Sequence, residues 1–370
     1  MPNWSAANRL TADSGVDAGG RRCRHAARCC GAPVRGVARR FSRFNPFRLA
    51  GLTGLLLAGL AESAGADPEA WLMKINHAAA SVSFSGVFVN AYDGELEATH
   101  VVHRVKDQML QERFYSLNGE TREVVRDKDH IWCYMPDQKV GVLDSRQSLQ
   151  RGFPRIEVGD LERIKRNYRF TEAGTERIAD RMAQRIDVTP NDDFRYGYHL
   201  WADLETGLLL RSDLVGRDRR VMEKYLFVTI DFDSEISDQD LQAVTSKDQL
   251  KWYGRDAPPV SAAPAGGASG ESNWQFSQLP AGYRLNKRIR RMSPVGGWEI
   301  EHLIWSDGLS TLSVFIKPAG SGHASVREGL TRMGAVQAYR RTIGDYRVTV
   351  MGEVPARTVE FFATGMVYAR

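Results

Sequence analysis

Residues 255–272, RDAPPVSAAPAGGASGES, consist almost entirely of proline, alanine, glycine and serine. A segment without large apolar side chains cannot bury a hydrophobic core, and this composition is typical of a linker. The segment separates residues 67–254 from residues 273–370, and both lengths are usual for single domains. We therefore expect two domains joined by a linker at residues 255–272.

Residues 1–66 carry the features of a secretory signal peptide with an extended basic n-region. A stretch rich in arginine precedes residues 49–61, LAGLTGLLLAGLA, which form an apolar run without a charge. This run is shorter than the about 20 residues that span a bilayer, and the small residues of Ala64-Gly65-Ala66 suit cleavage before Asp67. The alternative, a buried helix of a soluble domain, does not account for this three-part order. We expect export of residues 67–370 to the periplasm.

The basic charge of the chain belongs mostly to this leader. The full sequence has a formal net charge of +5, and residues 1–66 hold ten arginines and three acidic residues. Residues 67–370 therefore contain 40 basic and 42 acidic residues, and this balance removes the compositional support for nucleic-acid binding. Three of the four cysteines also lie in the leader. Cys133 alone remains, and its alternation with Ile131 predicts a buried apolar thiol rather than an internal disulfide.

The first domain is predicted to open with a helix and to continue as strands. Asp67 can cap a helix whose apolar stripe contains Trp71, Ile75, Ala78 and Ala79. Afterwards the apolar period changes to two, and about eight strand-like segments follow, which indicate one large curved antiparallel sheet. In YLFVTIDFD, this alternation puts Leu226, Val228, Ile230 and Phe232 on one side. In the first strand it gathers aromatic side chains on one face, where they either pack in a core or line a cavity for lipid: Phe84, Phe88 and Tyr92.

The second domain is predicted to be a smaller α+β unit. WEIEHLIW and LSTLSVFI read as two strands, and YRVTVMGEV reads as a third. REGLTRMGAVQAY, residues 327–339, has helix-like spacing, and a closing helix is expected from Pro355. The whole chain is therefore expected to have an α+β fold, with a large curved sheet followed by a smaller unit.

Residues 300–316, IEHLIWSDGLSTLSVFI, place His302, Ser306 and Asp307 close together, as a hydrolytic triad would require. However, Asp-Gly between two alternating apolar runs predicts a β-hairpin with a two-residue turn. Asp307 and Gly308 would form that turn, with Ser306 opposite Leu309 and His302 opposite Ser313. His302 and Ser306 would then lie roughly 13 Å apart along one strand, much farther than the about 3 Å that a nucleophile and its base need. We therefore expect Asp307 and Gly308 to be turn residues, and no catalytic site here.

The remaining motifs point to binding rather than to catalysis. The sequence has no G-x-S-x-G, H-E-x-x-H, G-x-x-x-x-G-K-[ST] or paired C-x-x-C motif, and we expect no metal or cofactor. His100 and His103 would face opposite sides of a strand, so they would not share a metal. The densest basic cluster outside the leader is NKRIRRMSP. It reads either as a solvated strand or as a contact for an anionic ligand or acidic partner, formed by Arg288, Arg290 and Arg291.

An ordered set of motifs resembles the MucB/RseB family, the periplasmic negative regulators of the envelope-stress sigma-E factor. In the first domain the matching segments are HVVHRV, SLNGETREVVRD, ERIADRMAQRIDV and YHLWADLETGLLLRSDLV. In the second domain they are SQLPAGYRL, IWSDGLSTLSVFI and VTVMGEVPART. The resemblance runs from about Trp71 to the end of the chain and is interrupted at the linker.

This resemblance implies a fold and a role. The larger domain would be a half-barrel sheet similar to periplasmic lipoprotein carriers, with helices on its concave face. The protein would not be an enzyme. It would bind the periplasmic part of a membrane-spanning anti-sigma factor, protect it from regulated proteolysis and be released by lipid or lipopolysaccharide. The alternative is a periplasmic lipid or lipoprotein carrier, and homo-oligomers are left open.

Overall fold

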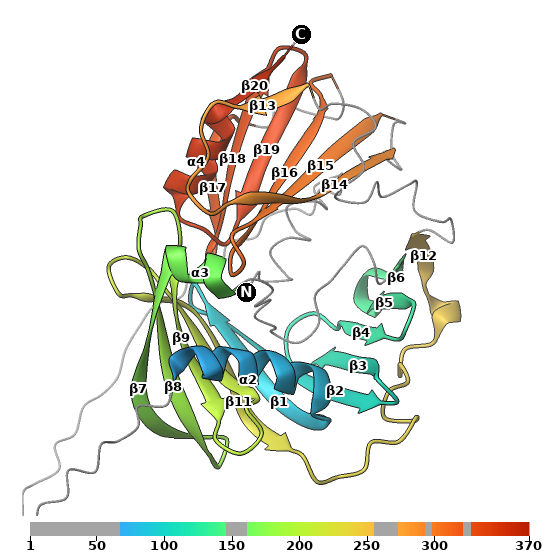
Figure 1. Cartoon of the computed structure of the whole chain (residues 1–370). Coiled ribbons are helices and arrows are strands. Elements are labelled where there is room, and N and C mark those ends of the chain that lie inside the picture. Colours follow the sequence, from blue (N-terminus) through green and yellow to red (C-terminus); the bar gives the residue numbers. More distant parts are fainter. Residues whose placement is uncertain (1–66, 146–160, 255–272, 293–297, 321–326, 370) are drawn as a thin grey trace, which may run out of the picture. The chain divides into compact units, whose positions relative to one another are not determined.

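Two β-sheets dominate the computed structural model of the chain (Figure 1). The structure describes residues 67–145, 161–254, 273–292, 298–320 and 327–369. The predicted signal peptide at residues 1–66 and the predicted linker at residues 255–272 lie outside the described residues. Within the described part, the predicted α+β fold with one large curved sheet is confirmed.

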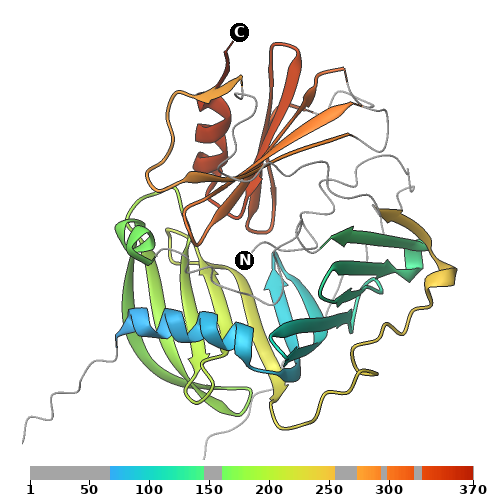
Figure 2. The same ribbon diagram turned by 45° about the vertical axis from the view of Figure 1, so that its right-hand side comes forward.

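The helix α2 (Pro68–Ser81) opens the described chain as predicted. The Asp67 carboxylate accepts a hydrogen bond from the Glu69 N–H at 3.0 Å, so it caps one of the free donors at the helix start. The helix lies across the large sheet (Figure 2) and buries one apolar face in the core formed with the strands. Trp71 of the predicted stripe is only partly buried, and the fully buried residues are Leu72, Ile75, Ala78 and Ala79.

The large sheet has twelve strands in the order β12-β6-β5-β4-β3-β2-β1-β11-β10-β9-β8-β7. All neighbours are antiparallel except β12 and β6, which pair in parallel because β12 follows a long connection from β11. The strands are β1 (Phe84–Tyr92), β2 (Glu95–Lys106), β3 (Met109–Ser116), β4 (Glu123–Arg126), β5 (His130–Met135), β6 (Val140–Ser145), β7 (Tyr168–Ile178), β8 (Arg181–Pro190), β9 (Gly197–Asp203), β10 (Leu209–Val215), β11 (Val221–Asp231) and β12 (Lys251–Gly254). Three short helical segments accompany them: η1 (Pro136–Gln138), α3 (Leu161–Asn167) and η2 (Lys247–Gln249).

A β-bulge in β11 corrects the predicted face of that strand. The pairing register with β1 shifts between Val87 and Phe88, so Val228 is the extra residue on β11. Val228 is 52% exposed, whereas Phe227 is 1% exposed and packs in the core. An extra residue reverses the alternation of a strand. The prediction that Leu226, Val228, Ile230 and Phe232 lie on one side of the strand is therefore wrong.

The second sheet has six strands in the order β14-β15-β16-β19-β18-β17, and helix α4 (Ala356–Gly365) packs on one of its faces. The strands are β14 (Arg284–Met292), β15 (Glu299–Ser306), β16 (Thr311–Pro318), β17 (Gly329–Met333), β18 (Val336–Ile343) and β19 (Tyr346–Gly352), and a separate two-stranded ribbon joins β13 (Trp274–Phe276) to β20 (Met366–Tyr368). The core under α4 combines the apolar side chains of these strands with those of the helix: Leu303, Leu312, Val314, Ile316, Val348, Val350, Val359, Phe362 and Ala363.

The helix predicted over residues 327–339 is wrong, because this segment forms the β17–β18 hairpin. Its apolar residues repeat over too few positions to distinguish a helix from two short strands, and Gly334 at φ 60° supplies the left-handed turn. The closing helix is confirmed with Pro355 at its N-cap, but it ends at Gly365 and the chain continues as β20.

Cys133 on β5 is buried as predicted. In the ranges that the structure describes, no helix is long and apolar enough to cross a membrane.

Candidate functional site

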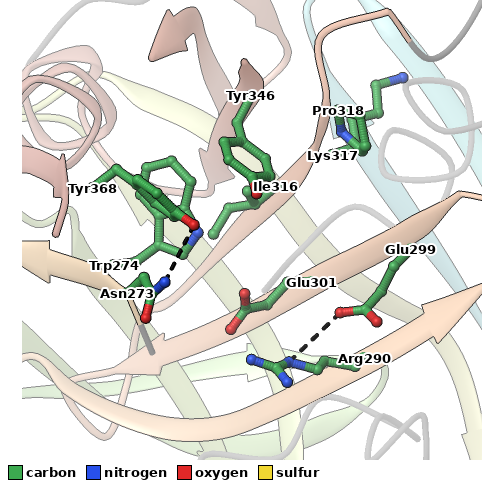
Figure 3. A pocket seen from close by; sticks show the side chains of 10 residues that line it. All are labelled: Asn273, Trp274, Arg290, Glu299, Glu301, Ile316, Lys317, Pro318, Tyr346 and Tyr368. Carbon is green, nitrogen blue, oxygen red and sulfur yellow. Dashed lines mark hydrogen bonds and ion pairs between the residues drawn. The ribbon is translucent and has the colours of Figure 1, made fainter. Parts of the chain in front are cut away.

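A pocket of about 370 Å³ opens at the end of the six-stranded sheet that lies next to the β13–β20 ribbon (Figure 3). Ile316 of β16 contributes an apolar side chain, and Trp274, Tyr346 and Tyr368 contribute aromatic ones. The remaining lining residues are polar or lie at the end of β16: Asn273, Arg290, Glu299, Glu301, Lys317 and Pro318. This mixture of aromatic and charged groups suits the binding of an amphipathic ligand or a peptide side chain.

The charged groups of the pocket are largely paired with one another. Arg290 on β14 lies 3.6 Å from the Glu299 carboxylate on β15 (Figure 3), and the neighbouring Arg288 donates to Glu301. The Asn273 amide donates to the Tyr368 hydroxyl at 3.2 Å, and this hydrogen bond lowers the pKa of Tyr368. No group of three or more His, Cys, Asp or Glu side chains in the described ranges could hold a metal ion. The pocket therefore presents balanced charge and aromatic surface.

The structure places the predicted basic cluster on β14, the strand at one edge of the second sheet. Arg288 and Arg290 share one face and each has a glutamate partner on β15. The side chain of Arg291 lies outside the described residues. Two of the three predicted anion-binding residues are thus already neutralised by this chain's own carboxylates.

The three aromatic candidates for lipid binding do not form one continuous surface. Phe84 is 1% exposed and stacks on His103, with ring centroids 4.7 Å apart. Phe88 packs against Tyr225 at 4.7 Å in the same core. Tyr92 lies at the end of β1, where its hydroxyl donates to Glu97 at 2.7 Å. A lipid role for Phe84, Phe88 and Tyr92 stays a prediction, and for Phe84 it would need the core to open.

The residues of the apparent triad make separate contacts. The His302 ring stacks on Phe315, with centroids 4.1 Å apart, while the Ser306 hydroxyl donates to the Ser310 carbonyl at 2.9 Å. Residues 307–310 form a four-residue connection, so Ser306 pairs with Thr311 and His302 with Phe315. The predicted two-residue turn and its register are therefore wrong. Asp307 and Gly308 do lie in this connection. The Asp307 carboxylate accepts hydrogen bonds from the N–H groups of its last two residues, Leu309 and Ser310.

Asp307 is fully buried and has four hydrogen-bond donors around its carboxylate. One oxygen accepts the N–H groups of Leu309 and Ser310 at 2.9 and 2.7 Å. The other accepts the Tyr168 hydroxyl at 2.9 Å and the Arg195 guanidinium at 2.6 Å, both from the part of the chain that forms the large sheet. This set satisfies a buried carboxylate, which would otherwise be very costly.

Burial and neighbouring charges shift the pKa values of both side-chain partners of Asp307. Burial raises the pKa of Tyr168 well above its ordinary value, and the Asp307 charge raises it further. Burial opposes the charge on Arg195, but Asp307 outweighs it, so the pKa of Arg195 is raised. No local motif in the sequence marks Tyr168 or Arg195 as a partner of Asp307, because both precede it by more than 100 residues.

Comparisons with known proteins agree over nearly the whole described chain. The MucB/RseB N-terminal domain model matches residues 67–245, and the MucB/RseB C-terminal domain model matches residues 268–367. The Sigma factor AlgU regulatory protein MucB of Pseudomonas aeruginosa is 31% identical over 314 residues, which cover 84% of this chain and 93% of that protein. The Sigma-E factor regulatory protein RseB of Escherichia coli K12 is 26% identical over 323 residues, which cover 87% and 97%.

Solved structures support the same relationship. The crystal structure of MucB in complex with MucA(peri) matches with a TM-score of 0.62 and 27% identity, covering 82% of this chain and 100% of that one. The complex structure of Pseudomonas aeruginosa MucA/MucB matches with the same score, identity and coverage.

Proposed function

Because the chain belongs to the MucB/RseB family, we propose that it is a sigma-factor regulatory protein that binds the periplasmic part of a membrane-spanning anti-sigma factor. The observation that carries the proposal is the match to MucB solved together with MucA(peri), which extends over 82% of this chain. A match over 82% of the chain is longer than either sheet and so takes in residues of both.

We propose that the working protein starts after residue 66, in the periplasm, and consists of two domains. Residues 67–254 would form the larger domain, residues 255–272 the linker and residues 273–370 the smaller domain. Binding would occlude the anti-sigma segment and so protect it from a protease. The paired charges and aromatic walls of the pocket in Figure 3 support binding rather than catalysis, and we propose no enzymatic activity.

Lipid or lipopolysaccharide would release the partner if it binds the free protein better than the complex. A ligand shifts such an equilibrium only by its difference in affinity for the two states. The apolar side of the large sheet, which includes Phe88, is the surface we propose for an acyl chain.

The test is a binding and protection assay with purified residues 67–370 and the periplasmic part of the anti-sigma factor of the same organism. We expect a stable complex, slower cleavage of the segment by its protease, and dissociation on addition of lipopolysaccharide. A scrambled segment of the same composition is the control.

Recovery of lipoproteins without any anti-sigma factor from an envelope extract, together with no binding of the purified segment, would overturn the proposal in favour of the carrier alternative. Cleavage at an unchanged rate in the complex would remove the protective role while leaving the binding role.

A further inference from the structure

The six-stranded sheet has a second face, opposite α4, that carries three cations from three strands. Lys317 on β16 is directly opposite Arg347 on β19. Arg341 on β18 points to α4, since its guanidinium donates to the Ala363 carbonyl at 3.1 Å, so its neighbour Arg340 points to the other face. Strand pairing thus brings Lys317, Arg347 and Arg340 together; we refer to these three residues as the cationic row.

The cationic row has no carboxylate partner among the described residues. Arg347 donates only to the Ala319 carbonyl at 3.4 Å, whereas Arg288 and Arg290 on the opposite face each pair with a glutamate. Burial lowers the pKa of Lys317, and the charges of Arg347 and Arg340 lower it further. Like charges placed directly opposite each other destabilise a sheet. The three residues are also partly buried, so water offsets the repulsion only in part.

Apolar groups adjoin the cationic row on the same face. Phe315, two residues before Lys317, carries the stacked ring of His302. Met351 of β19 and Ala338 of β18 pack next to Phe315 but are only 7% and 1% exposed, so they belong to a buried cluster and offer no surface to a ligand. A ligand for this face therefore needs negative charges for the cationic row and an apolar side chain that can contact the partly buried Phe315.

We propose that the cationic row binds an acidic, amphipathic segment of a partner protein, which on the proposed function is the periplasmic part of the anti-sigma factor. The cations are on neighbouring strands, and sheet spacing of about 4.8 Å spreads them over roughly 10 Å. A single phosphate is bound by donors that converge on it. A row of separated cations instead matches successive carboxylates on one side of a peptide, and the partly buried ring of Phe315 lies on the same face, where it can contact an apolar side chain.

The experiment measures the affinity of residues 67–370 for the periplasmic anti-sigma segment as a function of salt. The variant is K317Q/R340Q/R347Q, and the charge-matched control is K128Q/R169Q/R219Q, which removes three exposed cations of the larger part of the chain. We expect the row variant to bind at least about tenfold more weakly and with a shallower salt dependence, because charge pairs are lost. A segment whose Asp and Glu are replaced by Asn and Gln should bind wild type equally weakly.

A stability measurement separates a binding role from a structural one. Lys317→Gln should raise the Tm of the free protein by about 1 °C, because it relieves repulsion, while it weakens binding. A residue needed only for the fold would lower the Tm instead.

Each outcome decides the proposal. Equal affinity of wild type and the row variant would overturn the role of the row while leaving the proposed function intact. Failure of wild type to bind the segment at all would overturn both. Unchanged segment binding, combined with loss of binding to phosphatidylglycerol vesicles in the row variant, would reassign the face to anionic lipid.

Discussion

At the scale of single residues, Asp307 is a turn residue whose carboxylate accepts the hydrogen bonds of a buried network. Its sequence context, Asp-Gly between two strands, is that of an ordinary hairpin. In the fold its carboxylate is fully buried and collects donors from its own connection and from Tyr168 and Arg195. Removing one member of such a network destabilises the fold, because the charge of the other member stays buried without a partner of opposite charge.

We predict that Asp307→Asn lowers the free energy of unfolding by about 3 kcal/mol, since Arg195 loses a buried charge partner. Urea denaturation at neutral pH measures the change. Ser306→Ala is the control, because it removes two uncharged hydrogen bonds of the same connection, to the Ser310 carbonyl and from the Gly308 N–H, and should cost about 1–2 kcal/mol. Equal stability of Asp307→Asn and wild type would show that the network contributes nothing.

Asp203 gives a prediction about pH. Burial alone would raise the pKa of Asp203, but hydrogen bonds from Arg181 at 2.7 Å and from Thr206 at 2.8 Å outweigh burial and lower it. A carboxyl whose folded pKa lies below its unfolded value stabilises the fold when ionised. That stability is present above the unfolded pKa of about 4 and is lost as pH falls through the folded pKa.

We therefore expect Asp203→Asn to be less stable than wild type at pH 6–7, and the difference to shrink below roughly pH 4. Urea denaturation at a series of pH values measures it. A difference that stays constant with pH would mean that the ionised form of Asp203 has no special role.

At the scale of elements, β12 pairs with β6 at the edge of the large sheet, and Trp252 of β12 packs closely over β6 and β5. A Cβ atom at Gly141 on β6 would lie 2.6 Å from the Trp252 ring of β12, so only glycine leaves room for that ring. Trp252 also packs edge to face on Trp132 and Tyr134, with centroids 5.5 and 5.2 Å away. The parallel pair β6–β12 thus depends on a residue without a side chain.

Gly141→Ala should displace Trp252, cost about 1–3 kcal/mol and expose β12 to proteolysis. Limited proteolysis followed by mass spectrometry, together with urea denaturation, measures both effects. Gly320→Ala is the control, because nothing lies within 4 Å of its Cβ position. Unchanged cleavage around β12 would contradict the role assigned to Trp252.

Elements also differ in how far their sequences predict them. The helix α2 was predictable from its Asp67 cap and apolar stripe, and most strands from their period-two alternation. The β17–β18 hairpin was not, because its few apolar residues fit both periods and Gly334 acts only through its turn. The bulge at Val228 was not predictable either, since it is defined by pairing with β1, which lies more than 130 residues earlier in the chain.

At the scale of the whole molecule, the described parts around the two sheets share buried contacts. Besides Asp307, the Thr358 hydroxyl of α4 donates to the Phe194 carbonyl at 2.8 Å, and the Gly334 N–H donates to Asp93 at 2.8 Å. Ala335, in the β17–β18 turn, is fully buried in the core of the large sheet. These contacts join segments that sequence analysis assigned to separate domains.

The sequence by itself determined the α+β class, the large antiparallel sheet, the closing helix and the family resemblance, because these depend on local period, caps and ordered motifs. Only the tertiary structure decided which cations of the described residues have a carboxylate partner and which have none. Arg288 and Arg290, clustered in the sequence, are neutralised by Glu301 and Glu299, whereas the unpaired cationic row is assembled from three strands. Strand pairing sets these distances, and pairing between distant segments leaves no mark in the local sequence.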